Sequence, residues 1–487
     1  MKGVKIMSYG NRTPKSPSRV FFVLGIILIC VALVAGTIAL VFFFNGQGNG
    51  ASTVSTAPSA SSSLPTPTAS STATTGPSVS DVTDAEIQAL IDEADFIAAG
   101  YDYEKAITLL KSAPYYNEKP LLAEKVAAYE QAKSELVVWK DNSKIRHVFF
   151  HSLIVDTDKA FDGDFNSYSY NLYMTTVAEF NAILEQMYER GYVLISPYDM
   201  AHAVTDENGT HFEYGKILLP EGKIPFMMSQ DDVNYYGYMI GIDNDEHSIP
   251  KFVNSDCDGF AHKLVIGEDG YPTCEYMDKD GNIVTGDYDL VPLLESFIQK
   301  HPDFSYRGAR AMLAVTGYEG VFGYRTKPAY EDVMGSEAYA KEVADAKAVT
   351  QCLKDHGWII ASHSYGHPKY GEISAERVER DSTRWEDTVQ PVVGDTDILI
   401  FPHGSDIHDW HPIPADNEKF ITLYEDGYRY FFNVDSNIWN QLGTNHFRGG
   451  RLNLDGFVMY HRPYLLTELF DVETVFDPNR PTPVPSL

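Results

Sequence analysis

The sequence predicts an α/β fold with parallel strands, preceded by a membrane anchor, a low-complexity linker and a small helical module. Two observations support the α/β class. From about residue 145 onward, short apolar runs typical of buried strands alternate with amphipathic helical patterns, an order typical of parallel sheets. The residues best suited to chemistry directly follow two predicted strands, at the end where β/α barrels have their active sites.

The composition excludes one class of partner. The chain has 487 residues, enough for more than one domain, and 38 basic against 68 acidic residues give it a formal net charge of −30. Proteins that bind nucleic acid need a strongly basic surface. We therefore expect no nucleic-acid partner.

The N-terminus predicts a single-pass membrane protein. Residues 20–44 form an apolar run long enough to span a bilayer. Residues 1–19 contain basic side chains and no acidic ones, so they are expected to form a cytoplasmic tail, with the rest of the chain outside the cytoplasm. A cleaved signal peptide is the alternative, but no small-x-small cleavage site follows Phe44, which favours a retained anchor at the cell membrane.

Residues 45–80 are rich in Gly, Ser, Thr, Ala and Pro and contain almost no large apolar residue. A segment of this composition cannot bury enough apolar surface to fold. It is expected to be a linker that raises the following domains above the membrane.

Residues 81–142 have a helical pattern. A capping-box sequence begins at Thr83, and Gly100 is the expected stop of the first helix. A second helix follows at residues 103–110, and Pro120 suits the first turn of a third. The module is either a partner-binding unit similar to a tetratricopeptide hairpin, or a spacer or brace packed on the next domain.

The α/β region begins with a predicted strand at residues 146–151. A second capping box at Thr176 opens a helix that Gly191 ends, and residues 192–196 form the next predicted strand. Further along, residues 290–297 predict a helix and residues 311–316 another strand.

Two motifs predict a metal centre. His363 and His367 are two imidazoles four residues apart, and Asp231 and Asp232 form an acidic pair after a different strand. Two imidazoles and one carboxylate make a three-ligand site that leaves a position open for water or substrate. The second carboxylate is then a candidate general base.

The stretch from about residue 147 to 471 resembles the polysaccharide deacetylase family, the NodB-homology proteins of carbohydrate esterase family 4. The resemblance rests on five segments: Phe149-Phe150-His151, Ser229-Gln230-Asp231-Asp232, His363-Ser364-Tyr365-Gly366-His367, Phe401-Pro402-His403-Gly404 and Asn433-Val434-Asp435-Ser436-Asn437-Ile438-Trp439. It implies a distorted β/α barrel of about seven strands at residues 143–475, followed by a tail at residues 476–487.

The resemblance also implies roles for individual residues. Asp232, His363 and His367 would bind a divalent metal, expected to be zinc, with cobalt or nickel as alternatives. Asp231 would be the general base that activates water. The backbone N–H of His403 would help to stabilise the oxyanion.

Several positions depart from the family pattern. Ile400 stands where the third motif has the arginine that pairs with the base, and Gln230 and Val233 replace a Phe and a Gly around the acidic pair. The Leu-x-His motif of the general acid has no clear counterpart. His461, on a predicted strand at residues 457–461, is the candidate for that role, and a polar residue at a strand end is the alternative.

Two further residues are candidates for substrate binding. His151 follows the first strand of the predicted barrel, although a histidine satisfied within the core is the alternative. Trp439 lies in the last of the five segments.

Residues from about 240 to 286 are predicted to be an insertion of two hairpins that borders the substrate groove. Residues 278–282 faintly resemble a calcium loop, but they lack its glycine and final glutamate, so a plain turn is expected. Cys257 and Cys274 are a candidate disulfide.

The function expected from these observations is a membrane-anchored, metal-dependent deacetylase. Its substrate would carry N-acetyl or O-acetyl groups on an envelope polysaccharide or peptidoglycan. The alternative is a glycan-binding or scaffolding protein that uses the same barrel without catalysis, which the altered motifs favour.

Overall fold

The computed structural model describes residues 82–207, 209–240, 242–243, 251–252 and 258–487. The described residues belong to one compact unit, Gly76–Leu487. The expected cytoplasmic tail, membrane span and linker lie outside them. In the described part of the chain, no helix is long and apolar enough to cross a membrane.

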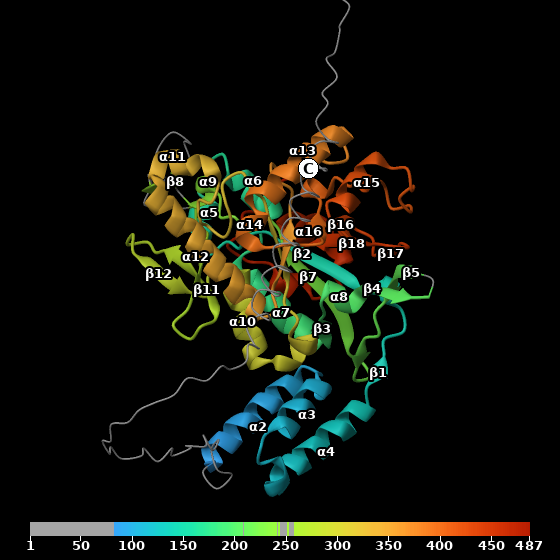
Figure 1. The fold of residues 1–487 in the computed structure, drawn as a ribbon. Helices are drawn as coiled ribbons and strands as arrows, with labels where there is room; N and C mark the ends of the chain where they lie inside the picture. Colours follow the sequence, from blue (N-terminus) through green and yellow to red (C-terminus); the bar gives the residue numbers. More distant parts are fainter. Residues whose placement is uncertain (1–81, 208, 241, 244–250, 253–257) are drawn as a thin grey trace, which may run out of the picture. The chain divides into compact units, whose positions relative to one another are not determined.

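Three helices form the N-terminal module: α2 (Asp84–Ala99), α3 (Tyr103–Ser112) and α4 (Pro120–Ser134) (Figure 1). The predicted capping box at Thr83 is present, and Pro120 occupies the first turn of its helix. Their inward side chains, among them Ala94, Leu110 and Leu122, form a hydrophobic cluster of their own.

Helix α2 ends at Ala99, directly before Gly100, so the expected stop of the helix is confirmed, although Gly100 does not adopt a positive φ. Its φ is −77°, and the positive φ of 67° falls on the next residue, Tyr101. Gly100 is needed instead for a close approach, because a Cβ there would lie 3.0 Å from the carbonyl oxygen of Ser305. The Arg307 N–H donates to the Gly100 carbonyl at 2.7 Å. These contacts fit a brace packed on the following domain, while a protein partner for the module stays a prediction.

The α/β domain is a closed ring of parallel strands. Its members, in order around the ring and along the chain, are β2 (Arg146–Phe150), β7 (Ile224–Gln230), β13 (Met312–Val315), β14 (Ile359–Ser362), β15 (Ile398–Ile400), β16 (Tyr430–Val434) and β18 (Phe447–Asn453). Pairing of β13 with β7 and of β18 with β2 closes the ring. The expected parallel barrel of about seven strands is therefore confirmed.

Two strands pair with the ring from outside it. The strand β3 (Tyr192–Leu194), predicted from the sequence, pairs with the first residues of β7, and β17 (Asn440–Leu442) runs antiparallel to β18. Smaller antiparallel pairs are β4 (Ala201–Asp206) with β5 (Gly209–Tyr214), β1 (Val137–Val138) with β6 (Leu218–Leu219), and β8 (Ile242–Asp243) with β9 (Lys251–Phe252).

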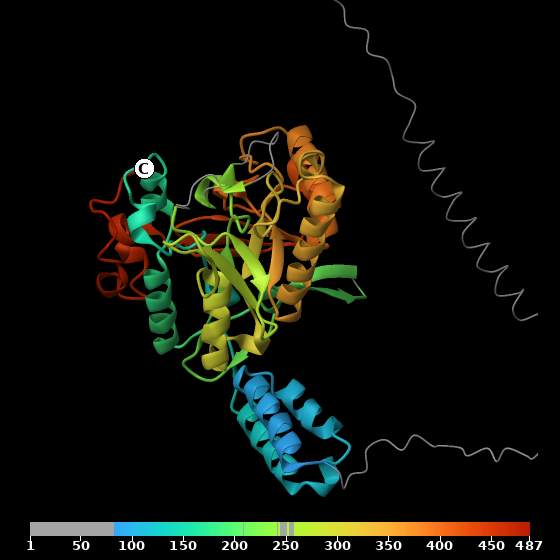
Figure 2. The same cartoon turned by 90° about the vertical axis from the view of Figure 1, so that its left-hand side faces the viewer.

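Helices follow the strands and cover the outside of the barrel (Figure 2). The longer ones are α7 (Val177–Glu189), α10 (Leu290–Lys300), α12 (Ser336–Asp355), α13 (Ala375–Thr388) and α15 (Glu418–Glu425). The shorter ones are α5 (Thr157–Ala160), α6 (Ser167–Tyr173), α8 (Pro197–Met200), α9 (Gly237–Ile240), α11 (Glu331–Met334), α14 (Gln390–Val393), α16 (Gly456–His461) and α17 (Val472–Val475).

The predicted hairpins of the insertion are present. Strands β10 (Lys263–Ile266), β11 (Pro272–Met277) and β12 (Ile283–Gly286) form an antiparallel sheet. In the turn between the last two, Asp278 accepts hydrogen bonds from the N–H groups of Asp280 and Asn282, which is the plain turn that was expected. Cys274 is buried and forms no disulfide within the described residues, and its candidate partner Cys257 lies outside them, so the disulfide stays a prediction.

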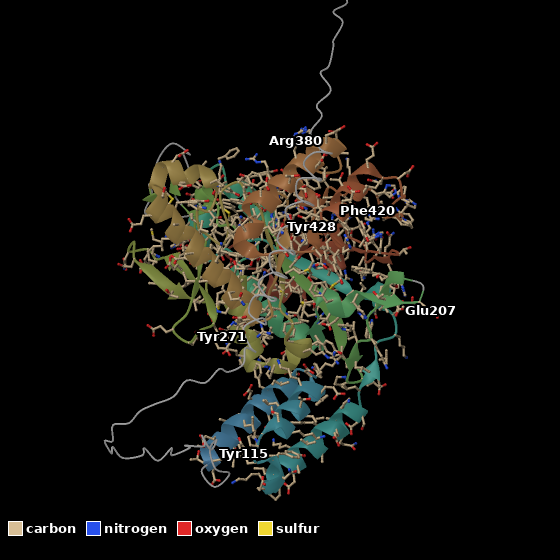
Figure 3. The ribbon with its side chains drawn as sticks, in the orientation of Figure 1. Tyr115, Glu207, Tyr271, Arg380, Phe420 and Tyr428 are labelled. Atoms are coloured by element: carbon tan, nitrogen blue, oxygen red, sulfur yellow. The ribbon has the colours of Figure 1, made fainter. Side chains whose placement is uncertain are left out.

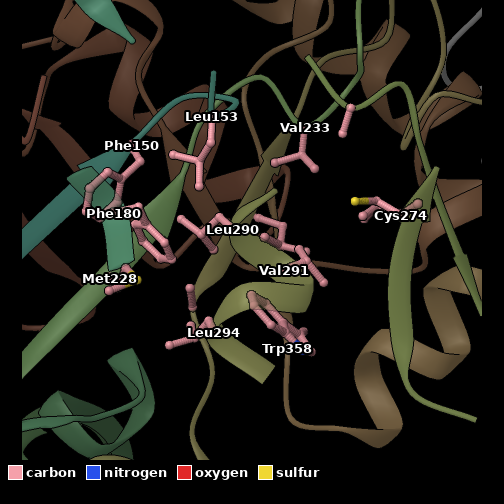
Figure 4. Close-up of a cluster of buried hydrophobic side chains, with 14 of the residues drawn as sticks. Phe150, Leu153, Phe180, Met228, Val233, Cys274, Leu290, Val291, Leu294 and Trp358 are labelled. Atoms are coloured by element: carbon pink, nitrogen blue, oxygen red, sulfur yellow. The ribbon is translucent and has the colours of Figure 1, made fainter. Parts of the chain in front are cut away.

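The main core lies between the strands and the helices that cover them. Phe150 and Met228, on neighbouring strands, pack with Phe180 of α7 and Leu294 of α10 (Figure 4). Figure 3 draws the side chains on the same fold. The Tyr428 side chain is buried inside the α/β domain, whereas Arg380 is exposed on α13 at its surface.

One buried carboxylate connects the core to the end of β7. Asp289 accepts hydrogen bonds from the Leu153 N–H at 2.9 Å, from Gln230 Nε2 at 3.0 Å and from the Tyr235 hydroxyl at 2.7 Å. Burial raises the pKa of Asp289, and these donors act in the opposite direction. Gln230, which departs from the family pattern, therefore has a structural partner directly before the acidic pair.

We predict that Asp289→Asn lowers the free energy of unfolding by about 2–4 kcal/mol, because an amide cannot accept from all three buried donors. Asp287→Asn is the matched control, since this exposed carboxylate accepts one bond, from Ser296, and should cost less than about 0.5 kcal/mol. Urea denaturation of residues 81–487 measures both. Equal losses in the two variants would contradict the structural role of Asp289.

Candidate metal and active site

The candidate site lies at the C-terminal ends of the barrel strands, as the sequence predicts. His151 follows β2, Asp231 and Asp232 follow β7, and His363 follows β14. These residues line a cavity of about 650 Å³. The closed ring brings together residues that lie more than 200 positions apart in the chain.

Asp232, His363 and His367 form a potential metal site. One ligand atom from each lies within 4.8 Å of the others. Nε2 of His367 lies 3.2 Å from Nε2 of His363 and 3.8 Å from Oδ2 of Asp232. Two imidazole nitrogens and one carboxylate oxygen are a donor set that suits zinc and related divalent ions.

The protonation of these residues also suits a cation. The Nδ1–H of His363 donates to the Ile400 carbonyl at 2.8 Å, which leaves Nε2 as the ligand atom. Burial lowers the pKa of His363 to about 4, so the ring is neutral near pH 7. Burial opposes ionisation of Asp232, but the neighbouring His367 holds the pKa of this carboxyl below its usual value.

A second layer of contacts orients Asp232. The Tyr236 hydroxyl donates to Asp232 Oδ1 at 2.6 Å, and it also contacts Thr316 Oγ1 at 2.7 Å. The Tyr236 ring stacks on Tyr318, with 4.8 Å between the ring centroids. Contacts of this kind fix the orientation of a ligand before a metal binds.

The backbone around the site is strained. Asp232, Ser364, His367 and His403 are non-glycine residues with φ between 56° and 63°. Residues other than glycine rarely adopt a positive φ, because the side chain then crowds the backbone. Backbone strain of this kind is typical of functional sites, where the surrounding structure enforces it.

Asp381 of α13 enforces this geometry in the histidine loop. Its carboxylate accepts from the N–H groups of Tyr365 and Gly366, at 2.8 and 3.0 Å, and from the Tyr370 hydroxyl at 3.0 Å. The Ser364 hydroxyl accepts from the His367 N–H at 3.0 Å. Each of the three residues between the two histidines thus takes part in a hydrogen bond that fixes the loop.

Asp231 lies beside the metal set and has its own partner. Arg451 of β18 donates from Nη1 to Oδ1 at 2.6 Å and from Nη2 to Oδ2 at 2.9 Å. Burial alone would raise the pKa of Asp231, but the Arg451 guanidinium holds it well below its usual range. Asp231 Oδ2 lies 4.0 Å from His363 Nε2, so an ionised carboxylate stands next to the metal ligands.

The pairing of Arg451 with Asp231 does not follow from the sequence motifs. Ile400 stands where the family pattern has an arginine for the base, and the structure supplies the guanidinium from β18 instead. The available signal was an arginine within an otherwise buried strand, because such a charge needs a buried partner.

The remaining predicted residues separate into two groups. His151 and His403 line the cavity, and the ring centroid of His403 lies 4.3 Å from that of His367. Trp439 and His461 are not among the residues that line it. The Trp439 indole donates to Asp435 Oδ2 at 2.9 Å, and it is Asp435 that faces the cavity. Their roles in catalysis or substrate binding stay predictions.

The expected strand at His461 is wrong. Residues 456–461 form helix α16, because Asp455 caps its N-terminus by accepting from the Val458 N–H at 2.7 Å. Burial raises the pKa of Asp455 to about 7, and this carboxyl also lines the cavity. The sequence does not single out Asp455 as a site residue. The apolar residues that follow it predict a strand, whereas they form the helix that Asp455 caps.

Comparisons with known proteins find structural similarity to deacetylases. No family model matches the chain, and no curated protein does. The deacetylase PplD of Streptococcus pyogenes, solved with acetate, aligns over 67% of this chain and 98% of its own, with 13% identity and a TM-score of 0.34. A de-N-acetylase from Aggregatibacter actinomycetemcomitans aligns over 64% and 95%, with 13% identity and a TM-score of 0.34.

A mutant pseudoenzyme of carbohydrate esterase family 4 with restored activity aligns over 43% of this chain and 86% of its own, with 10% identity and a TM-score of 0.20. With TM-scores below 0.5, these alignments are similarities only, and the fold and the site are assigned from the strands and residues of this chain.

We predict that Asp381→Ala weakens metal binding by roughly 10–100-fold, because the loop that holds His363 and His367 loses three hydrogen bonds. Asp387→Ala, on the same helix, should leave the affinity unchanged. Titration of the purified protein with zinc against a competing chelator measures both. Unchanged affinity in Asp381→Ala would show that the loop is ordered without this carboxylate.

Proposed function

We propose that the protein is a metal-dependent deacetylase that removes N-acetyl or O-acetyl groups from a polysaccharide of the cell envelope. The observation that supports this best is the pairing of two features in one cavity. A three-ligand set, Asp232, His363 and His367, adjoins a separate carboxylate, Asp231, that Arg451 holds ionised. Hydrolysis needs such a carboxylate to take a proton from the attacking water.

A divalent metal held by these three ligands would supply Lewis-acid polarisation of the acetyl carbonyl. The other steps fall to side chains and backbone of the chain. Asp231 accepts one proton of the water whose oxygen attacks the acetyl carbon. The backbone N–H of His403 is proposed to donate to the oxygen that becomes negatively charged.

His151 is the proposed proton donor to the leaving group. Its Nδ1–H donates to the Tyr173 carbonyl at 3.2 Å, which leaves Nε2 free for proton transfer. It lines the same cavity as Asp231 and Asp232. The bond from carbon to nitrogen or oxygen then breaks as the sugar takes this proton, and acetate leaves. His461, the earlier candidate, instead contacts carbonyls outside the cavity.

The alternative is a glycan-binding or scaffolding barrel without catalysis, which the departures from the family motifs favour. Two departures have structural replacements: Arg451 takes the place of the arginine absent at Ile400, and Gln230 is held by Asp289. A barrel kept only for binding would need neither an ionised base nor its buried counterion. These replacements support the enzyme.

We predict that Asp231→Asn keeps the metal and loses activity by on the order of 10²–10⁴-fold, because the amide cannot accept the proton. The double variant His363→Ala, His367→Ala should lose both metal and activity. Metal content of the purified chain and acetate release from N-acetylated and O-acetylated glycans measure the two properties. Full activity in Asp231→Asn, or stoichiometric metal in the double variant, would contradict the assignment, and wild type that binds metal but releases no acetate would favour the binding alternative.

The proposed location rests on composition alone. We infer that residues 20–44 anchor the chain, with the barrel outside the cytoplasm, because the charges before the apolar run are positive.

Protease added outside intact spheroplasts should therefore cleave within residues 45–80, whose composition lacks the apolar content to fold. It should release a fragment that starts near residue 80 and retains its metal. Protection of the barrel until the membrane is permeabilised would place it inside the cell and exclude envelope glycan as its substrate.

A further inference from the structure

The rim of the cavity has exposed apolar side chains. Tyr173, Tyr238, Val434 and Leu487 line the cavity, and yet 39%, 53%, 40% and 74% of their surfaces are exposed. The charged groups of the metal site are much more buried. Exposed apolar groups around a cavity with a polar base are typical of a surface that a ligand covers.

Leu487 reaches this rim through a segment that is built into the fold. We call residues 477–487 the strap. Its beginning is fixed by Arg480, whose guanidinium pairs with Glu179 of α7 where both side chains are fully buried. The Asn171 side chain then donates to the Pro481 carbonyl at 2.9 Å. An unpaired buried charge is costly, so this ion pair fixes the start of the strap firmly.

The last residues of the strap are held by two further side chains. Nε2–H of His461 donates to the carbonyls of Val484 and Pro485, at 3.0 and 2.9 Å. The Tyr168 hydroxyl donates to the Ser486 carbonyl at 3.1 Å, and Val484 is buried. The strap therefore ends beside α6, the helix that provides Tyr173 to the rim, and Figure 2 shows the end of the chain next to this helix.

We propose that the strap is a specificity element that places Leu487 in contact with a second sugar unit of the glycan, next to the unit whose acetyl group is removed. The proposal rests on the deacetylase function proposed above. His461 is then a positioning residue of the strap, and its partners explain why it lies outside the cavity.

The chemistry of the rim indicates what kind of glycan it contacts. The faces of a pyranose ring carry C–H groups, which pack on aromatic and aliphatic side chains and remove apolar surface from water. The net charge of −30 disfavours a strongly anionic polymer. An uncharged, N-acetylated glycan of at least two units fits the rim best.

The test is binding of N-acetylglucosamine oligomers of one to six units to the full-length chain carrying Asp231→Asn, measured by calorimetry. Affinity should rise from one unit to two or more. Adding Leu487→Ala should weaken binding of the longer oligomers by roughly 3–10-fold, because part of a leucine side chain's contact is lost. Tyr168→Phe should act in the same direction, since it removes the hydroxyl that holds Ser486 and keeps the ring. Ile266→Ala, an exposed apolar residue on β10 outside the cavity, is the matched control.

The proposal is overturned if the affinity does not depend on the number of sugar units in the oligomer. It is also overturned if the Leu487→Ala variant shows the same dependence on oligomer length as the chain with native Leu487. Acetate release by the chain with native Asp231 separates this outcome from the proposed function. Length-dependent binding without acetate release would leave the strap assignment intact and contradict the hydrolase. Acetate release with no effect of Leu487→Ala on oligomer affinity would support the hydrolase and contradict the strap assignment.

Discussion

The ion pair between Arg451 and Asp231 is the interaction on which the candidate site depends. Both side chains are buried, with exposed fractions of 0% and 4%, so each charge stabilises the other where water cannot. Arg451 also donates to Ser229 Oγ at 3.0 Å and to the Asn433 carbonyl at 3.1 Å, and its guanidinium lies over the Phe149 ring. One side chain thus connects β18, β7, β16 and β2, and this is possible because the ring of strands is closed.

The same ion pair separates the role of Asp231, the proposed base, from that of Asp232, the proposed metal ligand. Asp231 uses both oxygens for Arg451, while Asp232 turns to the histidines through a backbone with positive φ. Two adjacent aspartates therefore have different environments: one is held ionised by a fixed guanidinium and the other is available as a ligand. Such a separation of roles between neighbouring carboxylates is what a base beside a metal requires.

Local patterns predicted local structure well. The capping boxes at Thr83 and Thr176 begin helices because the side chains that satisfy their N–H groups are three residues away. The sequence predicts the two aspartates and the two histidines as a site because each pair lies within five residues and follows a strand. The pairing of Arg451 with Asp231 could not be predicted, since the two lie 220 residues apart and only the barrel brings them together. His461 was assigned to a strand because three apolar residues precede it, whereas Asp455 caps a helix there.

The structure also shows why departures from a motif do not by themselves abolish a site. Gln230 replaces an aromatic residue but joins the buried Asp289, and Ile400 gives up a guanidinium yet its carbonyl still fixes the His363 ring. The residues next to the ligands are thus held by contacts within this chain that its motifs do not predict.

The central claim is that an ion binds to Asp232, His363 and His367 while Asp231 stays paired with Arg451. The most direct measurement is a crystal structure of the zinc-loaded protein with anomalous data at the zinc edge. The account predicts one anomalous peak within bonding distance of these three side chains, at about 2.0–2.2 Å, with both contacts between Asp231 and Arg451 preserved. A peak coordinated by Asp231, or one elsewhere in the protein, would contradict it.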